Sequence, residues 1–227
     1  ITLSNQTLRY PAAVGTRTPE EEALAWLIVD DPARLNVSMG AERIRQRYAL
    51  LTLWFHLIPK QNKEPNIEPN SFFDKWLTID ECMWKGIRCA GNGLVYELDL
   101  SDHNLQGRIP DDLGLITSLQ TLSLHSSALS LNANKLSGTI PSSLSLLMAL
   151  QQLALYNNEL NGTIPSSLGQ LTSLTLLSLR GNALDGTIPS SLGQLKALET
   201  LSLSSNQLNG TIPDDLGLLT ALTDLGL

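Results

Sequence analysis

Two pairs of adjacent carboxylates are the residues whose type and spacing best suit acid/base chemistry. Asp111 and Asp112 form one pair, and Asp214 and Asp215 form the other. Paired carboxylates act as general acid and general base in many hydrolases. Both pairs, however, directly follow an Ile-Pro dipeptide in segments that otherwise resemble each other. This shared position favours a structural role, as the polar start of a chain segment, over catalysis.

Neither the histidines nor the cysteines are spaced like a catalytic or metal site. His56, His103 and His125 are the only histidines, and the sequence has no His-Glu-x-x-His motif, no Gly-x-Ser-x-Gly elbow and no glycine-rich phosphate loop. Cys82 and Cys89 are too few for a four-ligand zinc site but suffice for one disulfide, which we predict over free thiols. We therefore expect a protein that is not an enzyme and that binds no metal and no cofactor.

Charge and hydropathy argue against two classes of partner. The net charge of −7 and the pI near 4.9 argue against nucleic acid, because affinity for a phosphate backbone comes mainly from clustered Lys and Arg. The longest strongly apolar stretch, residues 49–58, is about half of the roughly 20 residues that span a bilayer. We expect no membrane span in these residues.

Four Asn-x-Ser/Thr sequons, together with the predicted disulfide, indicate the secretory pathway. The sequons begin at Asn5, Asn36, Asn161 and Asn209. The chain starts at Ile1 without Met, so a signal segment removed upstream is compatible with this interpretation. We predict an extracellular or cell-surface protein that is glycosylated at these asparagines.

The elements that carry these residues come from an internal repeat. Ile-Pro dipeptides end at Pro110, Pro141, Pro165, Pro189 and Pro213, which gives spacings of 31, 24, 24 and 24 residues. The units follow the template L-x-x-L-x-L-x-x-N-x-L-x-G-x-I-P-x-x-L-G-x-L-x-x. A fixed period in this range is the signature of a solenoid, in which each repeat forms one coil.

Each recurring residue type predicts one part of a coil. The alternation Leu201-Ser202-Leu203 has the two-residue period of a strand with one buried face, so stacked coils form a parallel sheet. Glycine followed by Ile-Pro suits a corner and a stiff return segment of short helical or extended character. Recurrent asparagines at the strand ends are predicted to form an internal ladder that pairs buried backbone groups. They are Asn134, Asn158, Asn182 and Asn206.

This template resembles the plant-type extracellular leucine-rich repeat, the class found in receptor-like kinase ectodomains and polygalacturonase-inhibiting proteins. The resemblance covers residues 94–227. It implies an α/β repeat solenoid: a right-handed superhelix with a parallel concave β-sheet, short helical return segments and a helical N-terminal cap. It also implies a second short sheet on the flank, built by Gly-Thr-Ile-Pro segments. These begin at Gly138, Gly162, Gly186 and Gly210.

Two departures from the template bear on a possible site. The first repeat has His103 at the ladder position, which we interpret as a ladder substitute rather than a ligand. The second repeat is seven residues longer and contains two near copies of one segment, residues 122–128 and 129–135. Either copy fits the strand, and the extra residues are either a neutral insertion or a functional loop.

The sequence before the repeats divides into an arm and a cap. Residues 1–39 are predicted as an N-terminal arm with one short helix from Thr18 to Val29. Residues 40–93 are predicted as a cap whose helix covers residues 40–58 and packs on the first coil, followed by a polar loop at residues 60–71. Residues 94–227 then form five full repeats and the start of a sixth, and we expect more protein beyond the incomplete repeat.

The cap resembles the Trp-rich, cysteine-containing cap of the same repeat class. The matching residues are Trp76, Cys82, Trp84, Gly86 and Cys89. In that class a Cys-Cys pair commonly stands at the first cysteine, and its extra member bonds upstream. Here Glu81 precedes Cys82 and no upstream cysteine exists, so the resemblance implies that the second cap disulfide is missing. Residues 18–27, 30–32 and 46–54 are also similar to the N-terminal regions of diatom leucine-rich-repeat proteins.

Function is sought on the exposed strand positions of the concave face, because that surface of a solenoid is extended and rigid. Tyr156 and Arg180 are the best anchors there, since Tyr and Arg often dominate binding energy. We predict a non-catalytic recognition module for a protein, peptide or polysaccharide. The alternative is a structural component of an extracellular matrix or surface filament, in contact with copies of itself or with matrix subunits. The predicted contact residues are Glu97, Asp99, Asp102, Gln152, Tyr156, Asn157, Arg180 and Ser204.

Overall fold

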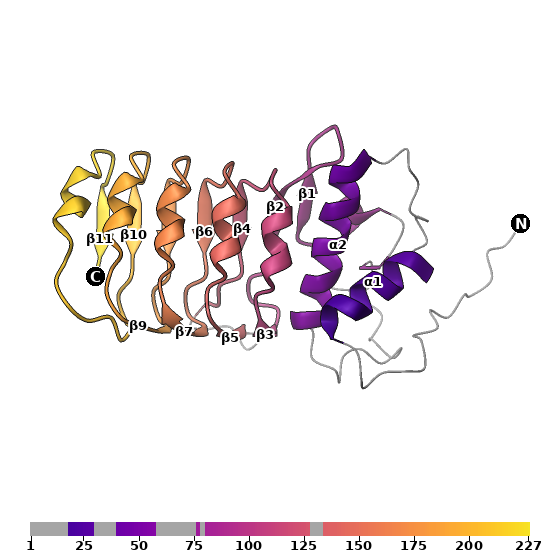
Figure 1. Ribbon diagram of the computed structural model, residues 1–227, viewed down its shortest axis with the longest axis horizontal. Helices are drawn as coiled ribbons and strands as arrows, with labels where there is room; N and C mark the ends of the chain where they lie inside the picture. Colours follow the sequence, from indigo (N-terminus) through magenta and orange to yellow (C-terminus); the bar gives the residue numbers. More distant parts are fainter. Residues whose placement is uncertain (1–17, 30–39, 58–75, 78–79, 128–133) are drawn as a thin grey trace, which may run out of the picture.

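The chain forms an elongated solenoid with two α-helices at its N-terminal end (Figure 1). The computed structural model describes residues 18–29, 40–57, 76–77, 80–127 and 134–227. The predicted arm before Thr18, the polar loop at residues 60–71 and the sequons at Asn5 and Asn36 lie outside the described residues. The helices and the solenoid follow one another along the long axis of the molecule (Figure 1).

The main sheet is parallel apart from its first strand. β1 (Ile87–Cys89) pairs antiparallel with β2 (Val95–Asp99). The strands that follow pair in parallel, each with the strand of the next coil. They are β4 (Thr121–Ser123), β6 (Gln152–Ala154), β8 (Leu176–Ser178), β10 (Thr200–Ser202) and β11 (Asp224–Gly226). This register confirms the repeat template, because it places equivalent residues of successive coils side by side.

A second parallel sheet lies on the flank, as the resemblance implied. Its strands are β3 (Gln106–Arg108), β5 (Lys135–Gly138), β7 (Glu159–Thr163) and β9 (Ala183–Asp185), in that order. The return segments are short 3-10 helices. They are η4 (Asp111–Leu115), η5 (Ser142–Leu146), η6 (Ser166–Gln170), η7 (Ser190–Gln194) and η8 (Asp214–Leu218).

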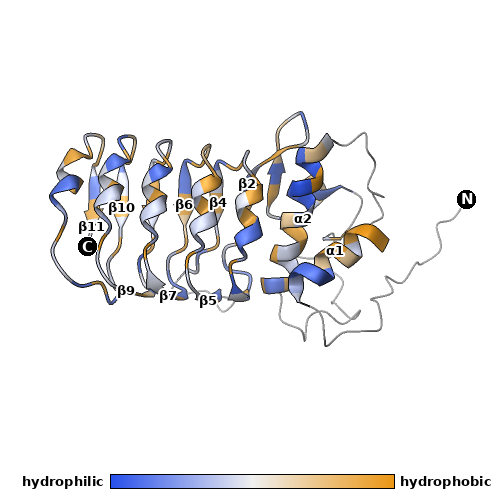
Figure 2. Ribbon diagram, viewed as in Figure 1, coloured by the Kyte–Doolittle hydropathy of each residue, from blue (hydrophilic) through white to orange (hydrophobic). Residues whose placement is uncertain are grey.

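One continuous apolar core runs from the helical cap through the coils. The repeat leucines are fully buried; Leu153, Leu177 and Leu201, at equivalent positions of three coils, are each 0% exposed. Figure 2 shows hydrophobic and hydrophilic residues alternating along the coils, as one buried face per strand requires. Each coil therefore depends on its neighbours to cover its core.

The predicted asparagine ladder is confirmed by its hydrogen bonds. Asn182 Nδ2 donates to the carbonyl of Leu179 in its own coil at 3.0 Å and to that of Leu155 in the preceding coil at 3.1 Å. Asn182 Oδ1 accepts from the backbone N of Leu160 at 3.1 Å. One amide side chain thus satisfies buried backbone groups of two coils. The same pattern holds at Asn134, Asn158 and Asn206.

His103 takes part of the ladder role, in agreement with its interpretation as a substitute. Its Nδ1 forms a hydrogen bond with the carbonyl of Ser101, two residues earlier. In the ladder, Asn158 Nδ2 likewise donates to the carbonyl of Tyr156, two residues before it. The backbone N of His103 donates to Asn134 Oδ1 of the next coil at 3.1 Å. Burial lowers the pKa of the imidazole, so a neutral ring caps the ladder.

The first of the two near copies in the second repeat occupies the strand. β4 contains Leu122, whereas residues 128–133 lie outside the described residues. Asn134 then enters the ladder directly, so the extra residues fall between the end of the strand and the ladder asparagine. In the other coils the residue before the ladder position has a positive φ: Asp102, Asn157, Gly181 and Ser205.

Glycine in the return segments is required by the approach of the next coil. A Cβ on Gly169 would stand 2.3 Å from the carbonyl oxygen of Ser191, and one on Gly193 would meet the carbonyl oxygen of Asp215 at 2.3 Å. Ser145 stands at the equivalent place in η5, and it is buried. The stacking of return segments is therefore backbone against backbone, which fixes the spacing of the coils.

The helical cap closes the first coil. α1 (Pro19–Val29) and α2 (Gly40–Leu57) agree with the predicted helices within one residue, and α2 packs on η4 and β3. Thr18 and Glu21 form a reciprocal capping box at the start of α1. His56 on α2 pairs with Glu20 on α1, Nε2 to Oε1 at 3.2 Å. The two helices are thus joined to each other and to the solenoid.

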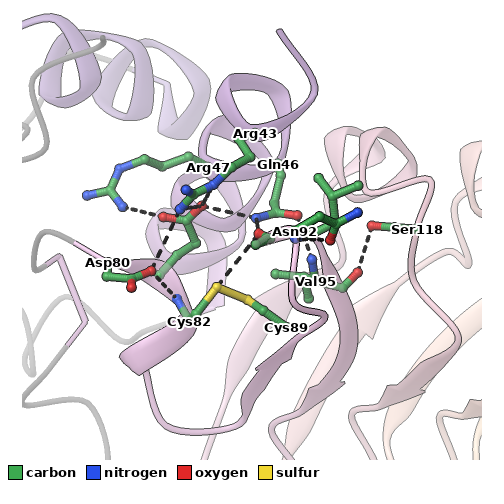
Figure 3. Close-up of a disulfide and its surroundings, with 12 residues drawn as sticks. Arg43, Gln46, Arg47, Asp80, Cys82, Cys89, Asn92, Val95 and Ser118 are labelled. Carbon is green, nitrogen blue, oxygen red and sulfur yellow. Dashed lines mark hydrogen bonds and ion pairs between the residues drawn. A yellow bond between two sulfur atoms is a disulfide. The ribbon is translucent and has the colours of Figure 1, made fainter. Parts of the chain in front are cut away.

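The cap is further held by a disulfide and by a buried ion cluster (Figure 3). The predicted bond between Cys82 and Cys89 is present. Glu81, in the short 3-10 helix η3 (Glu81–Met83), is fully buried. Its carboxylate accepts from Arg47 Nη1 at 2.8 Å, from Arg43 Nη2 at 3.1 Å and from Gln46 Nε2 at 3.0 Å. Glu81 stands at the position where the resembling caps carry the extra cysteine, and here its ion pairs and hydrogen bonds hold η3 against α2.

Candidate functional site

The register of the main sheet brings the predicted contact residues onto one face. Glu97 of β2 and Gln152 of β6 both pair with Thr121 of the strand between them. Tyr156 and Arg180 each lie two residues after the end of their strand, β6 and β8, and so occupy equivalent positions. Asp99, Gln152 and Arg180 are exposed. The half-buried members of the set are Glu97, Asp102, Tyr156, Asn157 and Ser204. We call this surface the strand face.

Glu97 and Asn157 both have polar partners within the protein. Glu97 Oε2 lies 3.2 Å from Arg88 Nη1 of the antiparallel strand β1. Asn157 Nδ2 donates to the carbonyl of Ser126 in the preceding coil at 2.8 Å. Both side chains therefore stabilise neighbouring backbone or charge, and neither is fully available to a ligand.

Asp99 and Asp102 lie at the cap-proximal end of the strand face and are held by hydroxyl and amide donors. Asp102 has a φ of 59°. Its Oδ1 accepts from the backbone N of Ser127 at 2.6 Å, and its Oδ2 accepts from the hydroxyl of Ser127 at 2.8 Å. Asp99 Oδ1 accepts from the hydroxyl of Ser101 at 2.6 Å and from its backbone N at 3.1 Å. Neither carboxylate forms a salt bridge with a Lys or Arg of the described residues.

An aromatic stack between β4 and β6 was not predicted from the sequence. The rings of His125 and Tyr156 are 4.1 Å apart, centroid to centroid, with an angle of 10° between their planes. The two residues follow Leu124 and Leu155 at equivalent places. The sequence places His125 beside Tyr156 only if the first near copy, residues 122–128, occupies the strand. The sequence alone left the choice between the two copies open.

The electrostatics of the stack depend on burial and on the nearby carboxylates. Burial lowers the pKa of His125 below 6.5, against the opposing effect of Asp99 and Asp102. Burial also raises the pKa of the Tyr156 hydroxyl, and the same carboxylates add to this shift. His125 Nδ1 is buried and has no hydrogen-bond partner among the described residues. The imidazole is therefore neutral at neutral pH.

This lowered pKa predicts a pH dependence. The folded state favours neutral His125, so its contribution to stability is present above pH 6.5 and is lost as the pH falls through the lowered folded-state pKa. We expect the imidazole of His125 to titrate with a midpoint below 6.5 in an NMR pH titration of the folded chain. A midpoint at or above that value would contradict the burial argument. The variant His125→Phe, which keeps a ring beside Tyr156, should lose this part of the acid destabilisation.

The carboxylate pairs considered first for catalysis lie in the return segments, away from the strand face. Asp111 and Asp112 open η4, and Asp214 and Asp215 open η8, the last return segment. Asp111 Oδ1 accepts from Ser143 of the next coil at 3.2 Å. Burial raises the pKa of Asp112, and the negative charge of Glu20 adds to this. Their arrangement agrees with the structural role inferred from the sequence.

The two sequons within the described residues lie on the flank. Asn161 is in β7 and is exposed, and Asn209 is exposed and bridges Thr187 at the end of the second sheet. No cluster of three or more His, Cys, Asp and Glu side chains arranged for a metal ion occurs in the described part of the chain. Across the same residues, the search for a helix long and apolar enough to cross a bilayer gave none.

The solenoid is similar to known leucine-rich-repeat proteins. Residues 149–171, 173–195 and 197–219 match the family model described as Leucine Rich Repeat. The chain is 33% identical to a chain of the BIR3–SERK2 complex from Arabidopsis thaliana. The match covers 78% of this chain and 90% of that one, with a TM-score of 0.62. It is 32% identical to the ectodomain of the Arabidopsis receptor kinase HAESA bound to an IDA peptide hormone (TM-score 0.57), over 85% of this chain and 33% of that one.

A curated relative is matched over a shorter segment. MDIS1-interacting receptor like kinase 1 of Arabidopsis thaliana is 37% identical over 65 residues, which is 27% of this chain and 6% of the length of that kinase. The match covers only a small part of that protein.

Proposed function

This chain belongs to the leucine-rich-repeat family that includes plant receptor ectodomains, and from this membership we propose that it is an extracellular recognition module. The strand face binds a protein, a peptide or a polysaccharide. The observation that carries the proposal is the strand face itself: a rigid parallel sheet with aromatic, cationic and anionic side chains in register across several coils. The similar structures include the BIR3–SERK2 complex and a receptor-kinase ectodomain with a bound peptide hormone, and both support the same class of function.

The module is proposed to be non-catalytic. The paired carboxylates lie at the starts of η4 and η8, the first and last return segments described, and each pair opens a segment that packs on a neighbouring coil. Two pairs so far apart do not form one acid/base site, because the reacting groups of a hydrolase lie within several Å of each other. The chemistry of the strand face is that of binding.

The placement of the sequons supports a secreted protein with an open strand face. Asn161 and Asn209 are exposed on the flank, two coils apart, and glycans attached there would cover the second sheet. The strand face would stay free for a partner. The disulfide between Cys82 and Cys89 fits the same oxidising compartment.

The first test is loss of partner binding in a strand-face variant. Tyr156→Ala combined with Arg180→Gln is expected to weaken binding by about tenfold or more, because both residues are the type that dominates interface energies. Partner contacts are mapped by cross-linking mass spectrometry on the native extracellular fraction, and affinity is then measured with the partner so identified. The matched control is Gln170→Ala combined with Gln194→Ala, two exposed glutamines on η6 and η7.

The outcomes of this test separate the two candidate functions. Cross-links from the strand face to a different molecule, with affinity lost only in the Tyr156 and Arg180 variant, support recognition. Cross-links mainly between copies of the chain or to matrix subunits favour a structural component of an extracellular assembly. Equal affinity of the strand-face variant and the control would remove the strand face as the binding site.

A further inference from the structure

The cap-proximal end of the strand face contains an interrupted aromatic row. Tyr156 and His125 stack at equivalent positions of two adjacent coils. The equivalent position one coil nearer the cap is Ser101, so a small polar side chain, and not an aromatic ring, follows His125 in the row. The backbone N of Asp102 donates to the carbonyl of His125 at 3.1 Å, which places the β2 coil directly beside the stack.

Two carboxylates flank this position. Asp99 is two residues before Ser101 and Asp102 is one residue after it. Both are oriented by serine donors, and both lack a Lys or Arg partner among the described residues. Glu97 of the same strand differs, because Arg88 already pairs with it. A carboxylate oxygen accepts more than one hydrogen bond, so both groups keep acceptor capacity toward the strand face.

We propose that the position above Ser101 receives an arginine side chain of the partner. The guanidinium would continue the aromatic row by lying on the His125 ring and would donate to Asp99 and Asp102. This inference rests on the proposed function, and it names the chemistry that the strand face recognises at its cap-proximal end.

The geometry favours arginine over lysine. A guanidinium is planar, stacks on aromatic faces and presents several N–H donors in one plane, so one group serves the ring and the carboxylates together. An ammonium is a compact, strongly hydrated charge that stacks poorly. The neutral state of His125 is compatible with a cation on its face, whereas a protonated imidazole would repel it.

The test is an NMR titration of the isotope-labelled chain at low ionic strength, where exposed ion pairs are least screened. The probes are N-acetyl-arginine amide, the isosteric but neutral N-acetyl-citrulline amide, and N-acetyl-lysine amide. The arginine probe is expected to shift the amide signals of Ser101, Asp102 and His125 with a saturating curve. The citrulline probe should shift them at least about threefold less at equal concentration, because it lacks the charge.

Two variants test the assignment of the residues. Asp102→Asn keeps the shape of the side chain and tolerates the positive φ, and it is expected to weaken the arginine probe by about three- to fivefold. Ser101→Tyr should fill the position and abolish the shifts at His125. The matched controls, Asp224→Asn on β11 and Ser202→Tyr on β10, lie on the same face away from the stack and should leave probe binding unchanged.

The results separate this inference from the proposed function. Equal shifts from arginine and citrulline, or shifts that survive both Asp102→Asn and Ser101→Tyr, would overturn the arginine assignment. If Ser101→Tyr leaves partner affinity intact while the Tyr156 and Arg180 variant loses it, recognition stands and the arginine assignment fails. If the arginine probe binds as expected but the partner cross-links elsewhere, the arginine assignment stands and the proposed strand-face function fails.

Discussion

Replacing Glu81 with glutamine is expected to lower the free energy of unfolding of the cap by about 3–5 kcal/mol, the usual cost of removing one partner of a buried ion pair. The side chains of Glu81 and Arg47 are both 0% exposed and their charged atoms are 2.8 Å apart. Glutamine keeps the size of the side chain but removes the buried negative charge that faces the Arg47 guanidinium. Arg47 also lies 5.3 Å from the centre of the Trp84 ring and 5.7 Å from that of Trp26, so its displacement would disturb both helices of the cap.

Tryptophan fluorescence during urea unfolding is the measurement, because all four tryptophans, at positions 26, 54, 76 and 84, lie before the repeats. The control is Arg88→Gln, which removes an exposed pair and should cost less than about 1 kcal/mol. The double variant Glu81→Leu with Arg47→Met should regain much of the loss, since an apolar pair of similar volume avoids desolvating the ions. A Glu81→Gln variant as stable as the Arg88→Gln variant would contradict the assigned role.

Replacing Gly169 with alanine is expected to destabilise the solenoid by about 1–3 kcal/mol, the range for overpacking a well-packed interior. The added Cβ would stand 2.3 Å from the carbonyl oxygen of Ser191, which is backbone of the next return segment and has no rotamer to change. The coils would have to separate, and separation exposes the leucines that each coil buries in its neighbour.

Gly217→Ala is the matched control, because Gly217 has the same place in its coil and a Cβ there meets nothing within 4 Å. It should be neutral or stabilising by up to about 1 kcal/mol. Far-ultraviolet circular dichroism follows the unfolding of both variants. Equal midpoints for the two alanine variants would show that the return segments do not pack backbone against backbone.

Ser145 indicates how a coil boundary accommodates a side chain at this place. The hydrogen bond from the Ser167 hydroxyl to the carbonyl of Ser142, across the boundary that contains Ser145, is 3.3 Å long. The equivalent bond from Ser191 to Ser166, across the boundary that contains Gly169, is 2.7 Å long. The hydrogen bond between η5 and η6 is therefore longer than the one between η6 and η7, as expected if the Cβ of Ser145 holds η5 and η6 further apart.

The coils could be predicted from the sequence because each position of the template has one physical reason to recur. Asn182 pairs two coils through its amide, and Leu177 fills the same place in the core as Leu153 and Leu201. The second sheet and the short helical return segments followed from the family resemblance, whereas their 3-10 type is seen in the structure. A sequence period reveals the interactions that recur from coil to coil, and these elements recur in that way.

What the sequence could not predict lies where the repeat is broken. The choice between the two near copies depends on which one places its neighbours in register, and only the paired strands decide this. That choice puts His125 beside Tyr156. Glu81 also gave no signal of its ion cluster, because its partners Arg43, Gln46 and Arg47 are more than 30 residues away and sit on a helix with no repeat to compare.

The ion cluster of the cap has a consequence for redox chemistry. A second disulfide would make the attachment of α2 to the first coil depend on the local thiol balance, and a reductant would cut it. The carboxylate of Glu81 has no such sensitivity. Reduction of the remaining disulfide opens only a link between residues with a sequence separation of 7, worth about 2–3 kcal/mol in the chain-entropy model. The helix α2, with its bonds to Glu81 and to the backbone N of Val95, stays in place as a reducing environment is entered.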